Sequence, residues 1–201
     1  MTRVAQLVVM AKRPELGRVK TRLAKGIGAV DATRFYRQTT YDLIRRMDAD
    51  ARWQTVLALA PDRAVHEAAM WPLDVPRVAQ GAGDLGDRMG RLMRDLPPGP
   101  VVIVGSDIPD ISRAHIAAAF RVLGSHDAVI GPADDGGYWL IGLRRWTRVP
   151  EIFDNVRWSG EHACADTLWN MTRERLTLAT LPVLSDIDTR DDYMRWRDRQ
   201  R

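Results

Sequence analysis

Short apolar runs alternate with longer stretches of helical periodicity along the sequence, and this alternation restricts the possible folds more than any other feature. The expected strands are residues 4–11, 53–60, 76–80, 101–107, 127–131, 138–143 and 176–184. The expected helices are residues 31–48, 63–71, 85–96, 112–123, 159–175 and 190–201. Several strand runs are apolar at consecutive positions, which is typical of strands buried on both faces. The alternation predicts an α/β fold whose mostly parallel central sheet carries helices on both faces.

Capping signals mark several of the expected helix starts. Asp31, Ser112 and Ser159 stand where an N-cap residue is expected. Thr189, followed three residues later by Asp192, has the pattern of a capping box.

Length and composition indicate one globular domain, which we place at residues 1–201. The chain is 45% hydrophobic and 28% charged, which is ordinary for a domain with a substantial core. Lys and Arg number 30 against 26 Asp and Glu, a formal net charge of +4. This bias suits an anionic ligand but is too weak for a dedicated nucleic-acid binder. We therefore expect a small-molecule partner and no nucleic acid.

The single cysteine, Cys164, excludes an intramolecular disulfide and a zinc site built from cysteines. A reducing compartment is then the default expectation. No apolar run approaches the ~20 residues of a membrane-spanning helix, and the first run ends at Lys12 and Arg13, unlike a signal peptide. We therefore expect the protein in the cytoplasm. The sequence does not predict its oligomeric state.

The loops after the strands are where chemistry is expected, because open α/β sheets bind ligands beyond the carboxyl ends of their strands. The first loop, residues 12–23, contains one acid, Glu15. Its cations are Lys12, Arg13, Arg18, Lys20 and Arg22. Such cations can surround phosphate oxygens, and Gly17 permits close backbone approach; a solvated charged loop is the alternative. The loop lacks the two-glycine frame of a P-loop, which disfavours a Walker-type ATPase.

The loop after the third strand contains a formal G-x-G-x-x-G at Gly81, Gly83 and Gly86. A dinucleotide site is disfavoured, because the Asp84 carboxylate would repel a pyrophosphate at this place. Two interpretations stay open. The loop can simply enter a helix with Asp84 or a neighbouring residue as its cap, or it can contact a nucleotide through backbone groups and Gln80.

Asp107 follows the most apolar strand, in the segment V-V-I-V-G-S-D-I-P-D-I. A carboxylate there suits Mg²⁺ or Mn²⁺, because Mg²⁺ typically takes one or two carboxylates together with phosphate oxygens and waters. A helix cap is the alternative, although Ser112 is better placed for that role. The late segment D-I-D-T-R-D-D, residues 186–192, offers Asp186 or Asp188 as a second carboxylate, or a helix cap.

The segment P-A-D-D-G-G-Y-W joins the fifth and sixth expected strands. Its polar and flexible residues are Asp134, Asp135, Gly136 and Gly137. A tight hairpin is the alternative to a role in the site, since Asp-Gly is a turn signal, and such a hairpin can still line a pocket. Trp139 and Trp158 are further candidates for the walls of a pocket.

Taken in order, these stretches resemble the DUF2064 family of uncharacterised bacterial proteins. The segments that carry the resemblance are MAKRPELGRVKTRL, GAGDLGDRM, GSDIPDI, GPADDGGYWLIGL, FDNVRWSG and DIDTRDD. They extend from about residue 4 to residue 192. The family is grouped with the GT-A glycosyltransferases, the nucleotide-diphospho-sugar transferase superfamily. The resemblance implies a Rossmann-like GT-A fold and a metal-dependent transferase with a nucleotide-sugar donor and a small-molecule acceptor.

A more distant resemblance links the chain to the nucleotidylyltransferases that make 2-phospholactate guanylyl adducts and molybdenum-cofactor dinucleotides. By this likeness Lys20 and Arg22 resemble the cations that grip the triphosphate. Asp107 resembles the metal-binding aspartate of a G-D-x-P segment, and Asp188 a late acidic position. The chain departs from both groups, since G-S-D-I-P replaces the D-x-D of many glycosyltransferases and the first loop lacks L-x-A-G-x-G.

Together, the residue patterns and the resemblances assign expected roles. The expected catalytic residues are Asp107, Lys20 and Asp135, and the expected metal ligands are Asp107 and Asp188. The expected nucleotide-binding residues are Lys12, Arg13, Arg18, Lys20, Arg22, Gln80, Gly81 and Asp84. The expected acceptor or sugar side is Asp134, Asp135, Gly136, Gly137 and Trp158. Sugar transfer is the leading function; the alternatives are nucleotidyl transfer to a small phosphorylated acceptor, and a nucleotide-binding module without catalysis.

Overall fold

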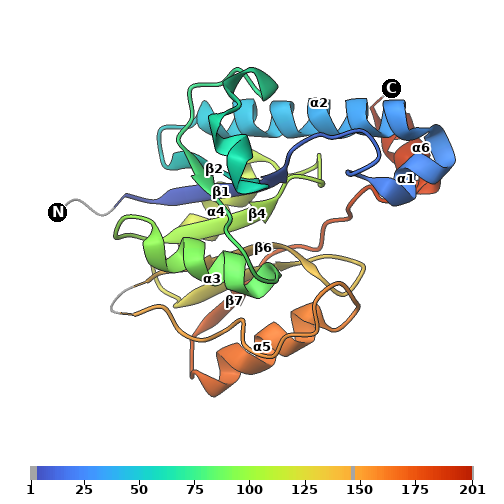
Figure 1. Cartoon of the computed structure of the whole chain (residues 1–201). Coiled ribbons are helices and arrows are strands. Elements are labelled where there is room, and N and C mark those ends of the chain that lie inside the picture. The colour runs from blue at the N-terminus through green and yellow to red at the C-terminus, as the bar shows by residue number, and fades with distance from the viewer. Residues whose placement is uncertain (1–3, 146–147, 201) are drawn as a thin grey trace.

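A computed structural model of the protein describes residues 4–145 and 148–200 (Figure 1). Within these ranges seven strands form one sheet, accompanied by six α-helices and two short 3-10 helices. The strands are β1 Gln6–Lys12, β2 Gln54–Ala60, β3 Arg77–Ala79, β4 Val101–Gly105, β5 Ala128–Pro132, β6 Tyr138–Leu143 and β7 Leu178–Thr180. The helices are α1 Thr21–Ile27, α2 Ala29–Asp48, α3 Leu85–Asp95, α4 Arg113–Val122, α5 Ala163–Arg173 and α6 Arg190–Arg199, with 3-10 helices η1 Asp62–His66 and η2 Ala68–Met70.

The sheet has the strand order β3-β2-β1-β4-β6-β5-β7. It is mostly parallel, as predicted; β6 runs antiparallel to its neighbours β4 and β5. From β1 the chain adds β2 and β3 on one side and then crosses to place β4 on the other. The strand order therefore reverses between β1 and β4, and such a reversal is where ligands bind in open α/β sheets.

Helices cover both faces of the sheet, also as predicted (Figure 1). In β1 the side chains of Leu7 and Val9 point into one core and that of Val8 into the other, because successive side chains of a strand alternate. The first core contains residues of α2 and α4, and the second contains residues of α3 and α5. Full burial of each large apolar side chain stabilises the fold by about 1.5–3 kcal/mol.

Some capping predictions are confirmed. Ser112 is the N-cap of α4 and accepts a hydrogen bond from the backbone N–H of His115. Asp84 is the N-cap of α3, in a reciprocal capping box with Asp87. Thr189 caps α6 and pairs with Asp192 in the same way.

Other expected helix features are wrong. Asp31 does not cap α2, which begins two residues earlier behind Gly28; Asp31 lies in its first turn. Ser159 does not cap α5, which starts at Ala163. There the N–H of Cys164 donates to the carbonyl of Gly136, so a distant backbone group satisfies a helix end that lacks a side-chain cap.

Residues 63–71 do not form the expected α-helix. They form the short helices η1 and η2. The guanidinium of Arg77 donates to the carbonyls of Glu67, Trp71 and Leu73, so these acceptors serve a tertiary contact rather than a continuous helix.

A third, smaller core attaches α6 to α1 and α2. Its buried residues are Leu23, Ala32 and Ile187. The rings of Tyr193 and Trp196 pack edge-on against Phe35, with centroid distances of 5.2 and 5.3 Å. This core fixes the segment before α6 against α1, at the edge of the sheet where β1 and β4 end (Figure 1).

Candidate active site

A cavity of about 640 Å³ opens where the strand order reverses between β1 and β4. Its apolar floor includes Met10, Ile103 and Ile141. The polar residues that line it and that the sequence singled out are Lys12, Arg18, Lys20, Arg22, Gln80, Asp84, Asp107 and Asp188. Segments far apart in the chain thus meet at the carboxyl edge of the sheet.

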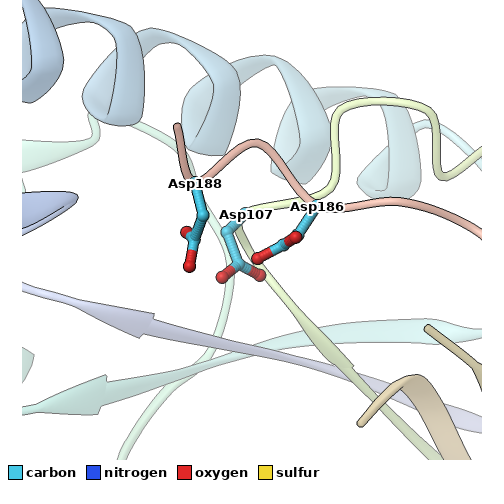
Figure 2. Close-up of side chains that lie close together, drawn as sticks. All are labelled: Asp107, Asp186 and Asp188. Atoms are coloured by element: carbon cyan, nitrogen blue, oxygen red, sulfur yellow. The ribbon is translucent and has the colours of Figure 1, made fainter. Parts of the chain in front are cut away.

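Three carboxylates converge at this edge, as Figure 2 shows. Asp107 comes from the loop after β4, and Asp186 and Asp188 come from the segment before α6. One oxygen of each carboxylate lies within 4.8 Å of the other two. Ile187, between the two late aspartates, is buried in the third core. Its burial turns both neighbouring carboxylates towards Asp107.

Lys20 lies directly beside these carboxylates. Its Nζ donates to Asp188 Oδ1 at 2.7 Å and lies 3.5 Å from Asp107 Oδ2. The side chain is only 5% exposed. Burial opposes the charge of Lys20, but the negative charges of Asp107 and Asp188 outweigh that effect and raise its pKa. Lys20 is therefore a buried ammonium group held by carboxylates.

The Asp186 carboxyl carries the clearest electrostatic perturbation of the cluster. Burial, followed by the negative charge of Asp188, raises its pKa to about 7, although Lys20 acts in the opposite direction. Arg22 adds one further cation, 3.1 Å from Asp188 Oδ2, on a side chain that is 70% exposed. Three carboxylates thus share one buried and one exposed cation, and the site has an excess of negative charge.

The donor set fits a divalent cation. Carboxylate oxygens are the hard ligands that Mg²⁺ and Mn²⁺ prefer. The ammonium of Lys20 already shows that a cation is held between Asp107 and Asp188. Asp107, Asp186 and Asp188 are therefore the residues that would hold the metal, so the expected pair of ligands gains Asp186.

The cations of the first loop divide into two groups. Lys12, Arg18, Lys20 and Arg22 line the cavity. Arg13 does not; its guanidinium pairs with Glu15 at 2.5 Å and with Glu67 at 2.7 Å. The ion pairs with these glutamates hold Arg13 away from the expected phosphate site.

The loop before α3 contributes to the cavity mainly through its helix start. Asp84 lines the cavity and caps α3. Gln80 lies at the wall, but its Nε2 donates to the carbonyls of Ala11 and Ala58, so this amide holds β1 and β2. Gly81 is not among the lining residues, and its N–H donates to Asp62.

Arg88 is a lining residue that the sequence did not single out. It lies one turn into α3 and its Nε donates to the carbonyl of Gly83. Its position four residues after the cap Asp84 was the available signal, because residues at this spacing share one helix face.

The residues expected on the acceptor side, Asp134, Asp135, Gly136, Gly137 and Trp158, are not among those that line the cavity. Asp134 and Asp135 are exposed in the turn between β5 and β6, and Asp135 Oδ1 accepts from the N–H of Gly137. Asp135 is close enough to Asp186 that its charge helps to raise the Asp186 pKa. Trp158 packs against Tyr138 and Phe153 in the second core.

Close packing explains why glycine stands at positions 86, in α3, and 136, in the turn between β5 and β6. A Cβ on Gly86 would lie 2.7 Å from the Trp158 ring, so α3 packs closely on this side chain. Gly136 has a φ of +85°, and a Cβ there would lie 2.3 Å from the carbonyl oxygen of Glu161. Both glycines therefore have a packing role.

Tyr36 of α2 connects the loop that follows β1 with the loop that follows β4. Its buried hydroxyl accepts from the N–H of Lys12 at 2.8 Å and lies 3.1 Å from the hydroxyl of Ser106. Burial raises the pKa of Tyr36, so the phenol stays neutral. This hydrogen-bonded group ties the start of the basic loop to the residue before Asp107.

Residues 22–160 match the model of a family described as an uncharacterized protein conserved in bacteria, DUF2064. The chain belongs to this family. The match covers more than half of the chain and confirms the resemblance seen in its motifs. Among curated proteins, none matches the sequence.

The solved structures that are similar to this DUF2064 chain include nucleotide-using transferases. A candidate nucleotide-diphospho-sugar transferase from Desulfovibrio desulfuricans G20 is 34% identical, with a TM-score of 0.87 over 94% of this chain and 84% of that one. The similarity supports a transferase at a coarse level and confirms the expected α/β fold.

Two more distant structures share the fold. One is a manganese complex of a Mycobacterium tuberculosis H37Rv protein, 24% identical, with a TM-score of 0.55 over 97% of this chain and 98% of that one. The other is a nucleotidyl transferase from Methanothermobacter thermautotroptrophicus, 16% identical, with a TM-score of 0.62 over 98% and 97%. In the described part of the DUF2064 chain, no helix is long and apolar enough to cross a membrane.

Proposed function

We propose that the protein is a metal-dependent transferase that takes a nucleotide-diphospho-sugar and transfers the sugar to a small-molecule acceptor. One observation carries this proposal: four cations of the basic loop and the carboxylates of Asp107 and Asp188 line one cavity at the reversal of the strand order. The similarity to the candidate sugar transferase from Desulfovibrio desulfuricans and the manganese complex of a protein of the same fold support it.

In this proposal the chain binds the donor mainly through its phosphates. Lys12, Arg18 and Arg88 line the cavity and offer charged donors to phosphate oxygens. The apolar floor excludes water from the donor, which strengthens these interactions. A divalent cation, when bound by the aspartates, neutralises charge on the phosphates. The preorganised loop cations stabilise the charge that develops on the departing nucleoside diphosphate.

The acceptor would enter beside the turn between β5 and β6. Asp135 is exposed there, and its negative charge helps to raise the pKa of Asp186. In this proposal the Asp135 carboxylate takes the proton from an acceptor hydroxyl. Asp134, Gly136 and Gly137 form the same turn and would shape the acceptor side.

Nucleotidyl transfer is the second candidate. Five cationic side chains line the cavity, and this number suits a triphosphate donor. They are Lys12, Arg18, Lys20, Arg22 and Arg88. The fold of the nucleotidyl transferase from Methanothermobacter favours the same alternative.

Product analysis separates these candidates. Purified protein is incubated with Mn²⁺, an acceptor mixture and either nucleotide sugars or nucleoside triphosphates. Release of a nucleoside diphosphate supports sugar transfer, and release of pyrophosphate supports nucleotidyl transfer. Nucleotide affinity that survives Asp107→Ala, without either product, would indicate a binding module and would overturn both.

A further inference from the structure

The ammonium of Lys20 lies where a divalent cation would have to bind. Nζ contacts Asp188 Oδ1 at 2.7 Å and approaches Asp107 Oδ2 to 3.5 Å. Both carboxylates belong to the set whose oxygens lie within 4.8 Å of one another. A divalent cation on the same oxygens would face a positive charge at contact distance, which is strongly unfavourable in a partly buried site.

Lys20 also has an unusual backbone conformation. Its φ and ψ are 46° and 47°, in the left-handed region that side-chain-bearing residues rarely adopt. Such a conformation persists where the surroundings hold it, and it is typical of functional sites. Lys20 is the residue directly before α1, so rotation about its side-chain bonds can move the ammonium while α1 stays in place.

Arg22 provides a comparison within the same site. It contacts the other oxygen of Asp188 at 3.1 Å, but its side chain is 70% exposed, whereas that of Lys20 is 5% exposed. Arg22 therefore approaches from solvent, and Lys20 is the inner counter-charge of the aspartates. A bound divalent cation would supply that charge and make the inner contact of Lys20 unnecessary.

The cavity offers Lys20 a second place. Lys20 itself lines it, together with Lys12 and Arg18, which face the space assigned to the phosphates. The flexible four-carbon stem of a lysine lets its ammonium exchange one group of oxygens for another. Phosphate oxygens of a bound donor would be the new partners.

We propose that Lys20 is an internal stand-in for the metal: in the ligand-free protein it neutralises the aspartates, a divalent cation displaces its ammonium from them, and the displaced ammonium binds the phosphates of the donor. The inference rests on the proposed function, since the metal and the phosphates are those of the proposed transferase. Metal and phosphate then bind cooperatively, and each raises the affinity for the other by the same factor.

Amine labelling of the wild-type protein tests the displacement without any variant. Metal-free protein, protein with saturating Mn²⁺, and protein with Mn²⁺ and pyrophosphate are each treated briefly with acetic anhydride. Mass spectrometry then compares Lys20 with Lys25, an exposed lysine on α1 that serves as the internal reference. We expect Lys20 to be protected without metal, labelled several-fold more with Mn²⁺, and protected again when pyrophosphate is added. Labelling that Mn²⁺ leaves unchanged would overturn the proposal.

Metal titration of variants tests the competition. Free Mn²⁺ is measured by electron paramagnetic resonance with wild type, Lys20→Met, Arg22→Met and Lys25→Met. The Lys20→Met protein lacks the competing ammonium, so it should bind Mn²⁺ at least about tenfold more tightly than the wild type, given the strength of repulsion at contact distance. Arg22→Met controls for the general loss of a positive charge near Asp188, and Lys25→Met for a charge change elsewhere on α1. Equal gains in Lys20→Met and Arg22→Met would contradict displacement.

The outcomes also distinguish this inference from the proposed function. Wild-type protein that binds no Mn²⁺, even with pyrophosphate, would overturn both. Wild-type protein that binds Mn²⁺ through Asp107, with no change at Lys20, would overturn the stand-in role alone. If Lys20→Met fails to fold, which thermal unfolding would reveal, the labelling of the wild-type protein still decides.

Discussion

At the scale of single residues, the sequence located Asp107, Lys20 and Asp188 because each follows a recognisable element, and the structure brings them together. Asp186 was less evident. Its signal was the alternation D-I-D, since an apolar residue buried between two acids in extended chain turns both acids to one side. Arg13 and Gln80 could not be placed from sequence, because their partners Glu67 and Ala58 are far away in the chain.

The Asp186 carboxyl predicts a specific pH dependence. Its pKa is about 7 in the folded protein and lies near 4 in an unfolded chain. A raised folded-state pKa stabilises the protonated form, so this contribution to the free energy of unfolding is full below pH ~4 and is lost as pH rises through ~7. Metal binding needs the deprotonated group and should therefore weaken as pH falls below ~7.

Thermal unfolding in chelator at pH 5 and pH 8 checks this prediction. The wild-type melting temperature should fall between these pH values by more than that of Asp186→Asn, which lacks the titrating group. The Mn²⁺ affinity of the wild type should rise over the same interval. Parallel pH profiles for the two proteins would mean that Asp186 does not titrate in this range.

Arg18 and Arg13 form a matched pair for phosphate binding. Arg18 lines the cavity, whereas Arg13 is paired with Glu15 and Glu67. We expect Arg18→Gln to weaken donor binding about tenfold or more, since hydrogen bonds to charged groups contribute roughly 1.5–3 kcal/mol. Arg13→Gln should leave the affinity unchanged within about twofold. Calorimetric titration of the best ligand compares them, and equal losses would contradict the assigned phosphate site.

At the scale of elements, the site depends on contacts that orient its loops. The third core holds the segment with Asp186 and Asp188 on α1, and Tyr36 of α2 holds the loops that follow β1 and β4. The sequence predicted α6 and its capping box but contained no sign that α6 packs on α1 and α2 beside the site. Packing between distant helices depends on tertiary shape, which local periodicity does not specify.

Ile187 should couple stability to metal binding. It is 3% exposed between the two late aspartates. We expect Ile187→Ala to lower the free energy of unfolding by about 2–5 kcal/mol, the usual cost of such a truncation in a core. Mn²⁺ affinity should fall as well, because both carboxylates lose their support. Val183→Ala, in a residue that is 58% exposed, is the control and should change stability by less than about 0.5 kcal/mol.

Denaturant unfolding and Mn²⁺ titration measure both effects. A destabilised Ile187→Ala protein with unchanged Mn²⁺ affinity would show that Ile187 serves the core alone.

Tyr36 should act through the loops it connects. Tyr36→Phe removes the acceptor of the Lys12 N–H and the partner of Ser106. Unpaired buried polar groups cost about 1–3 kcal/mol, so the melting temperature should fall. Tyr41→Phe is the control on the same helix, where Tyr41 lines a groove beside Met70 and Trp71. Equal melting temperatures for wild type and Tyr36→Phe would contradict this role.

At the scale of the whole molecule, the alternation of strands and helices was enough to predict the α/β class, the mostly parallel sheet and helices on both faces. It did not predict the strand order, because pairing is decided between segments distant in sequence. The Asp-Gly turn signal did suggest a hairpin between β5 and β6, and these two strands are antiparallel. The order matters for function, since it places the loops after β1 and β4 side by side. The structure with 34% identity to this chain, a candidate nucleotide-diphospho-sugar transferase, has a similar fold.

The most direct test of the account is a thermal-shift screen of nucleotide sugars and nucleoside triphosphates, with and without Mn²⁺, on wild type and Asp107→Ala. A ligand at a hundred times its Kd stabilises the folded state by about 2.7 kcal/mol, which raises the melting temperature by several degrees. We predict such a rise for wild type with Mn²⁺ and at least one donor, and its loss in Asp107→Ala. A folded wild-type protein that responds to no nucleotide, or an Asp107→Ala protein that responds as strongly, would contradict the proposed active site.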